Sequence, residues 1–284
     1  MLFVAHARYI PGMLHLRWIT DIHHRVPSDD AALRSHRESI LNNLEAFCTA
    51  AAADRPDMVI DTGDDIETTL DPVADERLHK EFHDYWSPVR GNSIRLAGNH
   101  DVACFQTGDL SRSFGFVSSV HIEKFRDATV ICWDADPTPL RGAGRTFYTA
   151  SAENLHDLAL ALDIAPAHKP VFLFSHIPLH ALGNEEWLGP SERSNPTKSH
   201  YSNTADILTL IEERNLKIIC LAGHRHVTTN LYYNDKIHLI TQDRFTRNLA
   251  LPNRPVSVNT SDIIVDRGAV DIHMYGAVPR TYRF

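Results

Sequence analysis

Short apolar runs alternate along the chain with longer segments in which apolar residues recur every three or four positions. The recurrence predicts helices over residues 29–53 and 72–86, a third that begins at Ser151 and a fourth that begins at Thr204. The short apolar runs predict buried strands over residues 14–22, 58–60, 93–97, 171–174 and 217–222. Strands that alternate with helices in this way are typical of an α/β fold with parallel strands.

Further segments predict antiparallel strands. Residues 114–122 and 128–133 carry Phe, Val, Ile and Trp at strand-like density and are expected to extend the sheet. Residues 229–241 are expected to form a hairpin that turns at Asn234-Asp235, and residues 262–276 another that turns near Arg267-Gly268. No internal repeat is visible, and we expect residues 1–284 to form one domain, although this length also fits two small ones.

Each predicted parallel strand is followed by polar residues that suit a metal site. They are Asp21 and His23 after the first strand, Asp64 after the second, Asn99 and His100 after the third, His176 after the fourth, and His224 and His226 after the fifth. In an extended chain residues i and i+2 point to the same side, so Asp21 and His23 are expected to reach one point. Because sites in such folds lie at the carboxyl ends of the strands, we expect the chemistry there.

Composition excludes some classes of function. The 284 residues are 43% hydrophobic and 23% charged, as in an ordinary soluble globular protein. A formal net charge of -8 argues against a general nucleic-acid or membrane-surface binder. The four cysteines form no Cys-x-x-Cys pair and are expected to be reduced, and we find no signal peptide or membrane span, so a cytoplasmic location is expected. The oligomeric state stays open, with a homodimer as one possibility.

Two other features are better explained by structure than by function. His79 and His83 stand at i and i+4 on a predicted helix, but no strand-end acid accompanies them, so we expect no metal there. The glycine-rich stretch at residues 141–145 lacks the Lys-Ser/Thr and the preceding strand of a phosphate-binding loop, so we expect a turn.

Taken in chain order, the strand-end residues form five short motifs. They are D-x-H at Asp21, G-D at Asp64, G-N-H-D at Asn99, H at His176 and G-H-x-H at His224. This series resembles the signature of the calcineurin-like metallophosphoesterase superfamily over residues 21–226. The resemblance implies an α/β fold, a four-layer β-sandwich flanked by helices, with a two-metal site at one edge.

The resemblance also implies which residues hold each ion. One ion would take Asp21, His23, Asp64 and His226, and the other Asp64, Asn99, His176 and His224, so that Asp64 bridges them. Two divalent ions and two carboxylates leave a surplus of about two positive charges, which favours a bridging hydroxide and attracts a phosphate ester. Imidazole and oxygen ligands without thiolate suit Mn, Fe or Zn better than Mg or Ca.

The implied reaction is hydrolysis of a small phosphate-ester substrate by hydroxide bound to the dinuclear centre. His100 would be the general acid, and Asp101 would orient or support it. We expect a phosphodiester, because the G-N-H-D motif and the chain length resemble the bacterial phosphodiesterase branch. The same core also serves phosphomonoesterases and nucleotide pyrophosphatases, which stay open as alternatives. A non-catalytic binding scaffold is a remote alternative, because every ligand position is intact.

Residues 180–203 are expected to form a substrate lid. They follow His176 directly, and a Gly- and Pro-punctuated loop of this length is often functional. The residues expected to contact substrate are Trp187, Arg193, Lys198 and Tyr201. A surface loop closed on itself is the alternative. In an extended chain Arg25 would point to the same side as Asp21 and His23 and would contact a phosphate. The alternative is a solvated arginine without that role.

Overall fold

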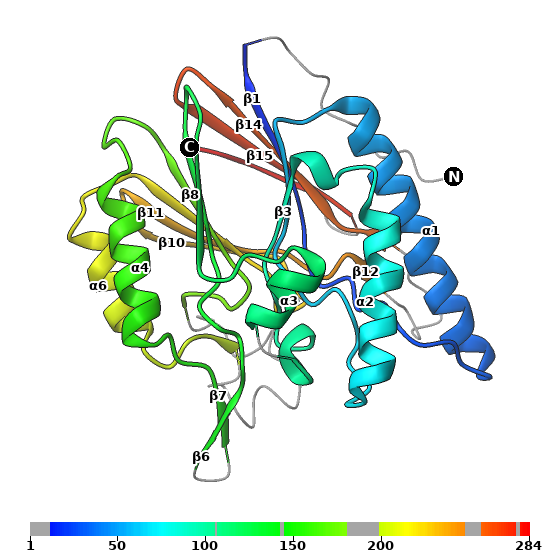
Figure 1. Ribbon diagram of the computed structural model, residues 1–284. Helices are drawn as coiled ribbons and strands as arrows, with labels where there is room; N and C mark the ends of the chain where they lie inside the picture. The colour runs from blue at the N-terminus through cyan, green and yellow to red at the C-terminus, as the bar shows by residue number, and fades with distance from the viewer. Residues whose placement is uncertain (1–11, 106, 143–144, 181–198, 248–256, 277–278) are drawn as a thin grey trace.

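Two six-stranded sheets lie at the centre of the molecule (Figure 1). The computed structural model describes residues 12–105, 107–142, 145–180, 199–247, 257–276 and 279–284. The first sheet contains, in spatial order, β16 (Arg280–Arg283), β15 (Ala269–Tyr275), β14 (Thr260–Asp266), β1 (Leu14–Ile19), β2 (Met58–Asp61) and β3 (Ser93–Arg95). The second contains β10 (Thr229–Asn234), β11 (Ile237–Thr241), β9 (Ile218–Ala222), β8 (Val171–Ser175), β5 (Thr129–Trp133) and β4 (Val120–Lys124).

Helices cover the outer faces of both sheets. The first sheet is covered by α1 (Ala31–Asp54) and α2 (Pro72–Trp86), and the second by α4 (Ala152–Asp163) and α6 (Thr204–Glu212) (Figure 1). The remaining short elements are η1 (Arg90–Asn92), η2 (Asp101–Ala103), α3 (Thr107–Phe114), and the strand pairs β6 (Leu140–Gly142) with β7 (Arg145–Phe147) and β12 (Thr246–Arg247) with β13 (Ser257–Val258). This is the helix-flanked α/β sandwich that the motifs implied.

Three apolar layers hold the sandwich together. Between the sheets, Trp18 of β1 meets Phe174 of β8 edge to face, with ring centroids 5.8 Å apart. Leu173 points the other way, into the layer under α4 and α6, because successive strand residues face opposite sides. All five residues of β8 are therefore buried, which explains why this strand is an unbroken apolar run. A third layer joins α1 and α2 to the first sheet.

The parallel strands direct their carboxyl ends to one end of the molecule. In the first sheet β1, β2 and β3 run parallel, and in the second β5, β8, β9 and β11 do so. The segments that follow these strands lie at the end of the sandwich where α3 and the β6–β7 hairpin are found (Figure 1). Residues distant in sequence are thereby brought together.

Most predicted elements are confirmed, including both antiparallel hairpins. The first strand was predicted too long, because it ends at Ile19. The edge strand predicted over residues 114–122 begins only at Val120, after α3 has ended at Phe114.

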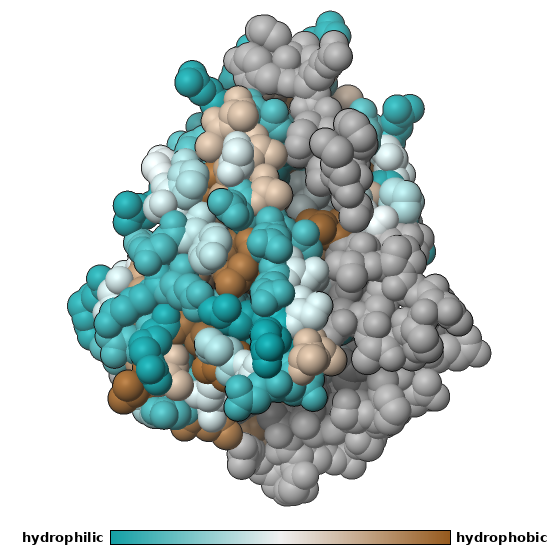
Figure 2. All heavy atoms as spheres, turned by 90° about the vertical axis from the view of Figure 1, so that its right-hand side faces the viewer, coloured by the Kyte–Doolittle hydropathy of each residue, from teal (hydrophilic) through white to brown (hydrophobic). Residues whose placement is uncertain are grey.

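The outer surface over α1 is mostly hydrophilic (Figure 2). Along this helix Leu33 is the one large apolar side chain that is exposed. No helix within the described residues is both long enough and apolar enough to cross a membrane.

Candidate metal centre

The loops that follow β1 and β2 are hydrogen-bonded to each other residue by residue. The backbone N–H of Asp21 donates to the carbonyl of Gly63 at 2.8 Å, and that of His23 donates to Asp64 at 2.9 Å. Asp21, His23 and Asp64 have φ angles of 55°, 51° and 57°. The prediction of an extended chain at Asp21 and His23 was therefore wrong, although the two side chains do meet. Left-handed backbone at non-glycine residues is costly and concentrates at functional sites.

Glycines let the loops approach closely. A Cβ at Gly98 would lie 2.2 Å from both the backbone N and Oδ1 of Asp64. A Cβ at Gly223 would lie 1.9 Å from Oγ1 of Thr20 and 2.3 Å from Oδ2 of Asp21. No larger residue fits at either position without moving an acidic side chain, so the glycines of the G-N-H-D and G-H-x-H motifs have a steric role.

Two groups of ligand atoms converge at this end of the sheets. In the first group, ligand atoms of Asp21, His23, Asp64 and His226 lie within 4.8 Å of one another. The second group, with the same spacing, contains Asp64, His176 and His224. Asn99 lies beside the second group, with Oδ1 3.2 Å from Nε2 of His176. The structure thus brings together all seven residues expected to bind metal, with Asp64 common to both groups.

His176 is held in the orientation that a metal ligand needs. Its Nδ1 lies 2.8 Å from the carbonyl oxygen of Thr62. A carbonyl only accepts, so Nδ1 donates its proton to this hydrogen bond, and Nε2 is the nitrogen that faces Asp64, whose Oδ2 is 3.4 Å away, and that would bind an ion. A backbone carbonyl that fixes the tautomer is a common support for metal-binding histidines.

Acidic and imidazole side chains shift each other's pKa in this site. Burial alone would lower the pKa of His23, but hydrogen bonds to Asp21 and Glu67 outweigh it and raise the pKa to about 10. At His176 burial would likewise lower the pKa, but the negative charge of Asp64 outweighs it and raises the pKa to about 9. Metal ions compete with protons for these nitrogens, so a carboxylate-rich set of imidazoles fits divalent cations.

Asp101 links the two metal-binding loops, a contact that the sequence did not predict. We expected it to orient or support His100, which stays a prediction, and its carboxylate also accepts hydrogen bonds from backbone N–H groups of both metal-binding loops. Oδ2 accepts from Asp64 and from Gly98, each at 2.8 Å, and Oδ1 accepts from Asp65 at 3.1 Å. Asp101 is fully buried. It therefore ties the loop that carries Asn99 to the loop that carries Asp64.

Glu67 was missed in the sequence and lies beside three predicted site residues. Its carboxylate is 3.6 Å from Nδ1 of His100, 3.4 Å from Nδ1 of His23 and 3.0 Å from Arg25. Burial would raise the pKa of Glu67, but the His23 hydrogen bond and the charges of His23, His100 and Arg25 lower it to about 2. In the sequence, the sign that Glu67 belongs to the site is its position three residues after Asp64.

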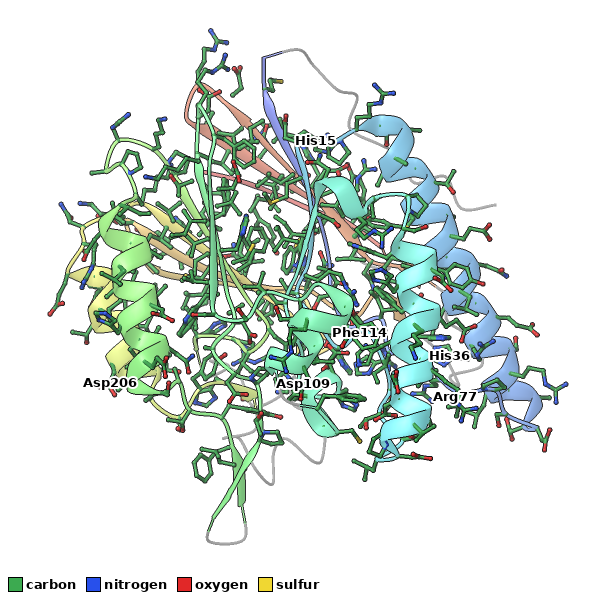
Figure 3. The ribbon with its side chains drawn as sticks, viewed as in Figure 1. His15, His36, Arg77, Asp109, Phe114 and Asp206 are labelled. Carbon is green, nitrogen blue, oxygen red and sulfur yellow. The ribbon has the colours of Figure 1, made fainter. Side chains whose placement is uncertain are left out.

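Other predicted positions have structural roles or lie outside the described residues. His79 packs with its ring centroid 5.1 Å from that of Phe114 of α3, which is labelled in Figure 3. The expectation that no acid accompanies His79 was wrong, because ligand atoms of His79, Asp65 and Asp101 lie within 4.8 Å of one another. Tyr201 is 1% exposed and contacts Trp133, so the prediction that it contacts substrate was wrong. Trp187, Arg193 and Lys198, with most of the predicted lid, lie outside the described residues. The predicted turn within residues 141–145 falls between β6 and β7, which pair as a hairpin.

Comparisons with known proteins agree with this geometry. No curated protein matched the sequence. The fold is similar to a dimetal phosphatase from Danio rerio, with a TM-score of 0.70 and 14% identity over 95% of this chain and 98% of that chain. It is also similar to a purple acid phosphatase from yellow lupin (Lupinus luteus) seeds, with a TM-score of 0.64 and 11% identity over 95% of this chain and 53% of that chain.

A family model described as calcineurin-like phosphoesterase matches residues 15–245. This range includes every residue of the two ligand groups. The chain therefore belongs to the calcineurin-like phosphoesterases, a family of hydrolases that depend on a dinuclear metal centre.

Proposed function

We propose that this protein hydrolyses a phosphodiester at the site formed by the two ligand groups. The observation that carries the proposal is the sharing of Asp64 between the groups, since one carboxylate has two oxygens with which to join neighbouring ions. Asp21, His23 and His226 would complete one ion site. Asn99, His176 and His224 would complete the other. Two divalent ions, Mn, Fe or Zn, supply Lewis-acid activation of the phosphoryl group and of water.

His100 is proposed as the general acid. Its ring centroid lies 4.8 Å from that of His23, and its side chain is 27% exposed, so it stands at the rim where substrate would enter. The carboxylate of Glu67 lies 3.6 Å from Nδ1 of His100 and holds the ring at the rim, where it would protonate a departing alkoxide. Glu67 is thus a positioning residue for His100.

The preference for a diester is supported by charge at the rim. A phosphomonoester dianion carries one more negative charge than a diester. Among the described residues Arg25 is paired with Glu67 at 3.0 Å. Its positive charge is therefore already balanced and is not available to neutralise the additional negative charge of a monoester. Phosphomonoester or nucleotide pyrophosphate hydrolysis on the same core is the second candidate, because the family fold serves several ester classes.

The free cysteines support a reducing compartment. Cys48, Cys132 and Cys220 are buried, Cys104 is half-buried, and all four are free thiols. We propose a cytoplasmic location on this ground.

The test is hydrolysis by protein reconstituted with Mn, Fe or Zn. We expect kcat/KM for bis(4-nitrophenyl) phosphate to exceed that for 4-nitrophenyl phosphate by about tenfold or more. His100→Ala should keep both metals and lower kcat by about 10²–10⁴, with a smaller loss for better leaving groups. His168→Ala, which changes an exposed histidine, is the control. Equal losses for good and poor leaving groups would reject His100 as the acid, and a preference for the monoester would favour the second candidate.

A further inference from the structure

An acidic cavity, lined by none of the seven predicted metal ligands, lies between α4 and the segments that follow β5 and β7. Its volume is about 460 Å³, and it is lined by the four carboxylates of Asp134, Asp136, Glu153 and Asp157 together with serine and threonine residues. No Lys, Arg or His is found among its described lining residues. Four carboxylates facing one space repel each other unless a positive charge lies between them.

Asp134 is the residue that points to a ligand. It is only 4% exposed, and its Oδ2 has no hydrogen-bond partner among the described residues. Burial and then the charge of Asp136 raise the pKa of Asp134 well above its usual value. A buried polar atom without a partner is costly and calls for a compensating group. A backbone hydrogen bond from Asp136 and the positive charge of His176 act in the opposite direction on the pKa of Asp134 but do not outweigh burial and the charge of Asp136.

Neighbouring contacts fix other acidic groups of the cavity. Oδ1 of Asp136 accepts hydrogen bonds from the backbone N–H and the hydroxyl of Thr138, at 3.1 and 2.6 Å. Asp157 accepts a hydrogen bond from the hydroxyl of Ser119. These contacts hold the carboxylates at the cavity wall rather than leaving them to turn into solvent.

The cavity adjoins the strand that carries a metal ligand. Cys132 of β5 pairs with Phe174 of the parallel strand β8. Asp134 and His176 each come two residues later, directly after the ends of these neighbouring strands. Because neighbouring strands lie about 4.8 Å apart, the cavity begins one strand away from the metal centre.

We propose that this cavity binds the ammonium group of a small hydroxylated amine, with Asp134 as its central anion. An ammonium group offers three N–H donors to carboxylates. The serine and threonine hydroxyls of the cavity suit hydroxyl groups on the rest of the ligand. A bare metal ion fits less well. The described acidic groups of this cavity do not bring three ligand atoms within 4.8 Å of one another, and its volume suits an organic molecule.

The first experiment measures binding of ethanolamine to the full-length protein by calorimetry, with ethylene glycol as the uncharged comparison. We expect binding of the amine alone, weakened about tenfold or more in Asp134→Asn. Asp163→Asn, at the other end of α4 and outside the cavity, should bind normally. Asp136→Asn is a second variant that should also weaken binding. It should fold, because asparagine tolerates the φ of 46° at this position and offers the same acceptor to Thr138.

A second experiment distinguishes the two sources of such an ammonium, a separate amine or part of the substrate. It compares kcat/KM for 4-nitrophenyl 2-aminoethyl phosphate with that for 4-nitrophenyl ethyl phosphate. A preference for the amino ester that Asp134→Asn abolishes would place the ammonium on the substrate. Binding of ethanolamine without that preference would assign the cavity to a separate ligand.

In both cases metal content and hydrolysis of the ethyl ester should be unchanged by Asp134→Asn, which separates this proposal from that for the metal centre. Failure of ethanolamine to bind, or equal binding to the wild type and both cavity variants, would overturn it.

Discussion

Asp101→Asn is expected to loosen the metal centre rather than to disable an acid. The substitution keeps the size of the side chain but replaces one carboxylate oxygen by an NH₂ group. Each oxygen of Asp101 accepts backbone hydrogen bonds, two of them at 2.8 Å on Oδ2. Whichever oxygen the NH₂ group replaces, at least one backbone N–H of the loop that follows β2 would face another donor instead of an acceptor.

The size of the effect follows from those donors. An unsatisfied buried donor costs about 1–3 kcal/mol, so two of them cost about 2–6 kcal/mol. An opposing contribution exists, because burial and then the charges of Asp65 and Asp64 raise the pKa of Asp101 well above its usual value. Removal of the charge relieves part of this repulsion. We therefore expect the free energy of unfolding to fall by about 2 kcal/mol, near the lower limit.

Denaturant unfolding and elemental analysis of the same preparations would measure this. Asp101→Asn should lose stability and bound metal together. The matched control is Asp109→Asn, on the nearby helix α3, whose exposed carboxylate pairs with Arg112 and should change stability by less than about 0.5 kcal/mol. Normal stability and metal content, with a rate loss confined to poor leaving groups, would refute loop anchoring and restore the sequence-based role of orienting His100.

Two further predictions concern packing and pH. Gly98→Ala should displace the Asp64 carboxylate, because the new Cβ would lie 2.2 Å from it, and should lower metal occupancy in elemental analysis; full occupancy would contradict the steric argument. Asp262 accepts hydrogen bonds from His15 and Arg17, which outweigh burial and lower its pKa from 3.8 to about 2. Its stabilisation is therefore present above about pH 4 and is lost as pH falls through about 2, and amounts to about 2 kcal/mol. Asp262→Asn should destabilise the protein at pH 7 but much less at pH 2 in denaturant unfolding, and an equal deficit at both would exclude the ion pair as the cause.

The sequence was sufficient for the fold class because its signals are local. The apolar run of β8 and the helical spacing of α1 each follow from burial against one sheet face. The clustering of strand-end ligands also follows, since parallel strands bring their carboxyl ends together.

What the sequence could not supply is the backbone path and the contacts across loops. Asp21 and His23 meet through left-handed turns rather than through an extended chain, because hydrogen bonds to the loop after β2 stabilise those angles. Tyr201 is aromatic and lies in a predicted lid, but nothing local indicates that it packs on Trp133. The proximity of Glu67 to His100 likewise depends on how two loops pair.

Elemental analysis of wild-type protein and Asp64→Ala after metal reconstitution would show whether one carboxylate holds both ions. Asp64 belongs to both ligand groups, so its removal should affect both. We predict two ions per wild-type chain, loss of both metal and activity in Asp64→Ala, and a nearly equal loss in Asp64→Asn. Two bound ions and a near-normal rate in Asp64→Ala would contradict this prediction.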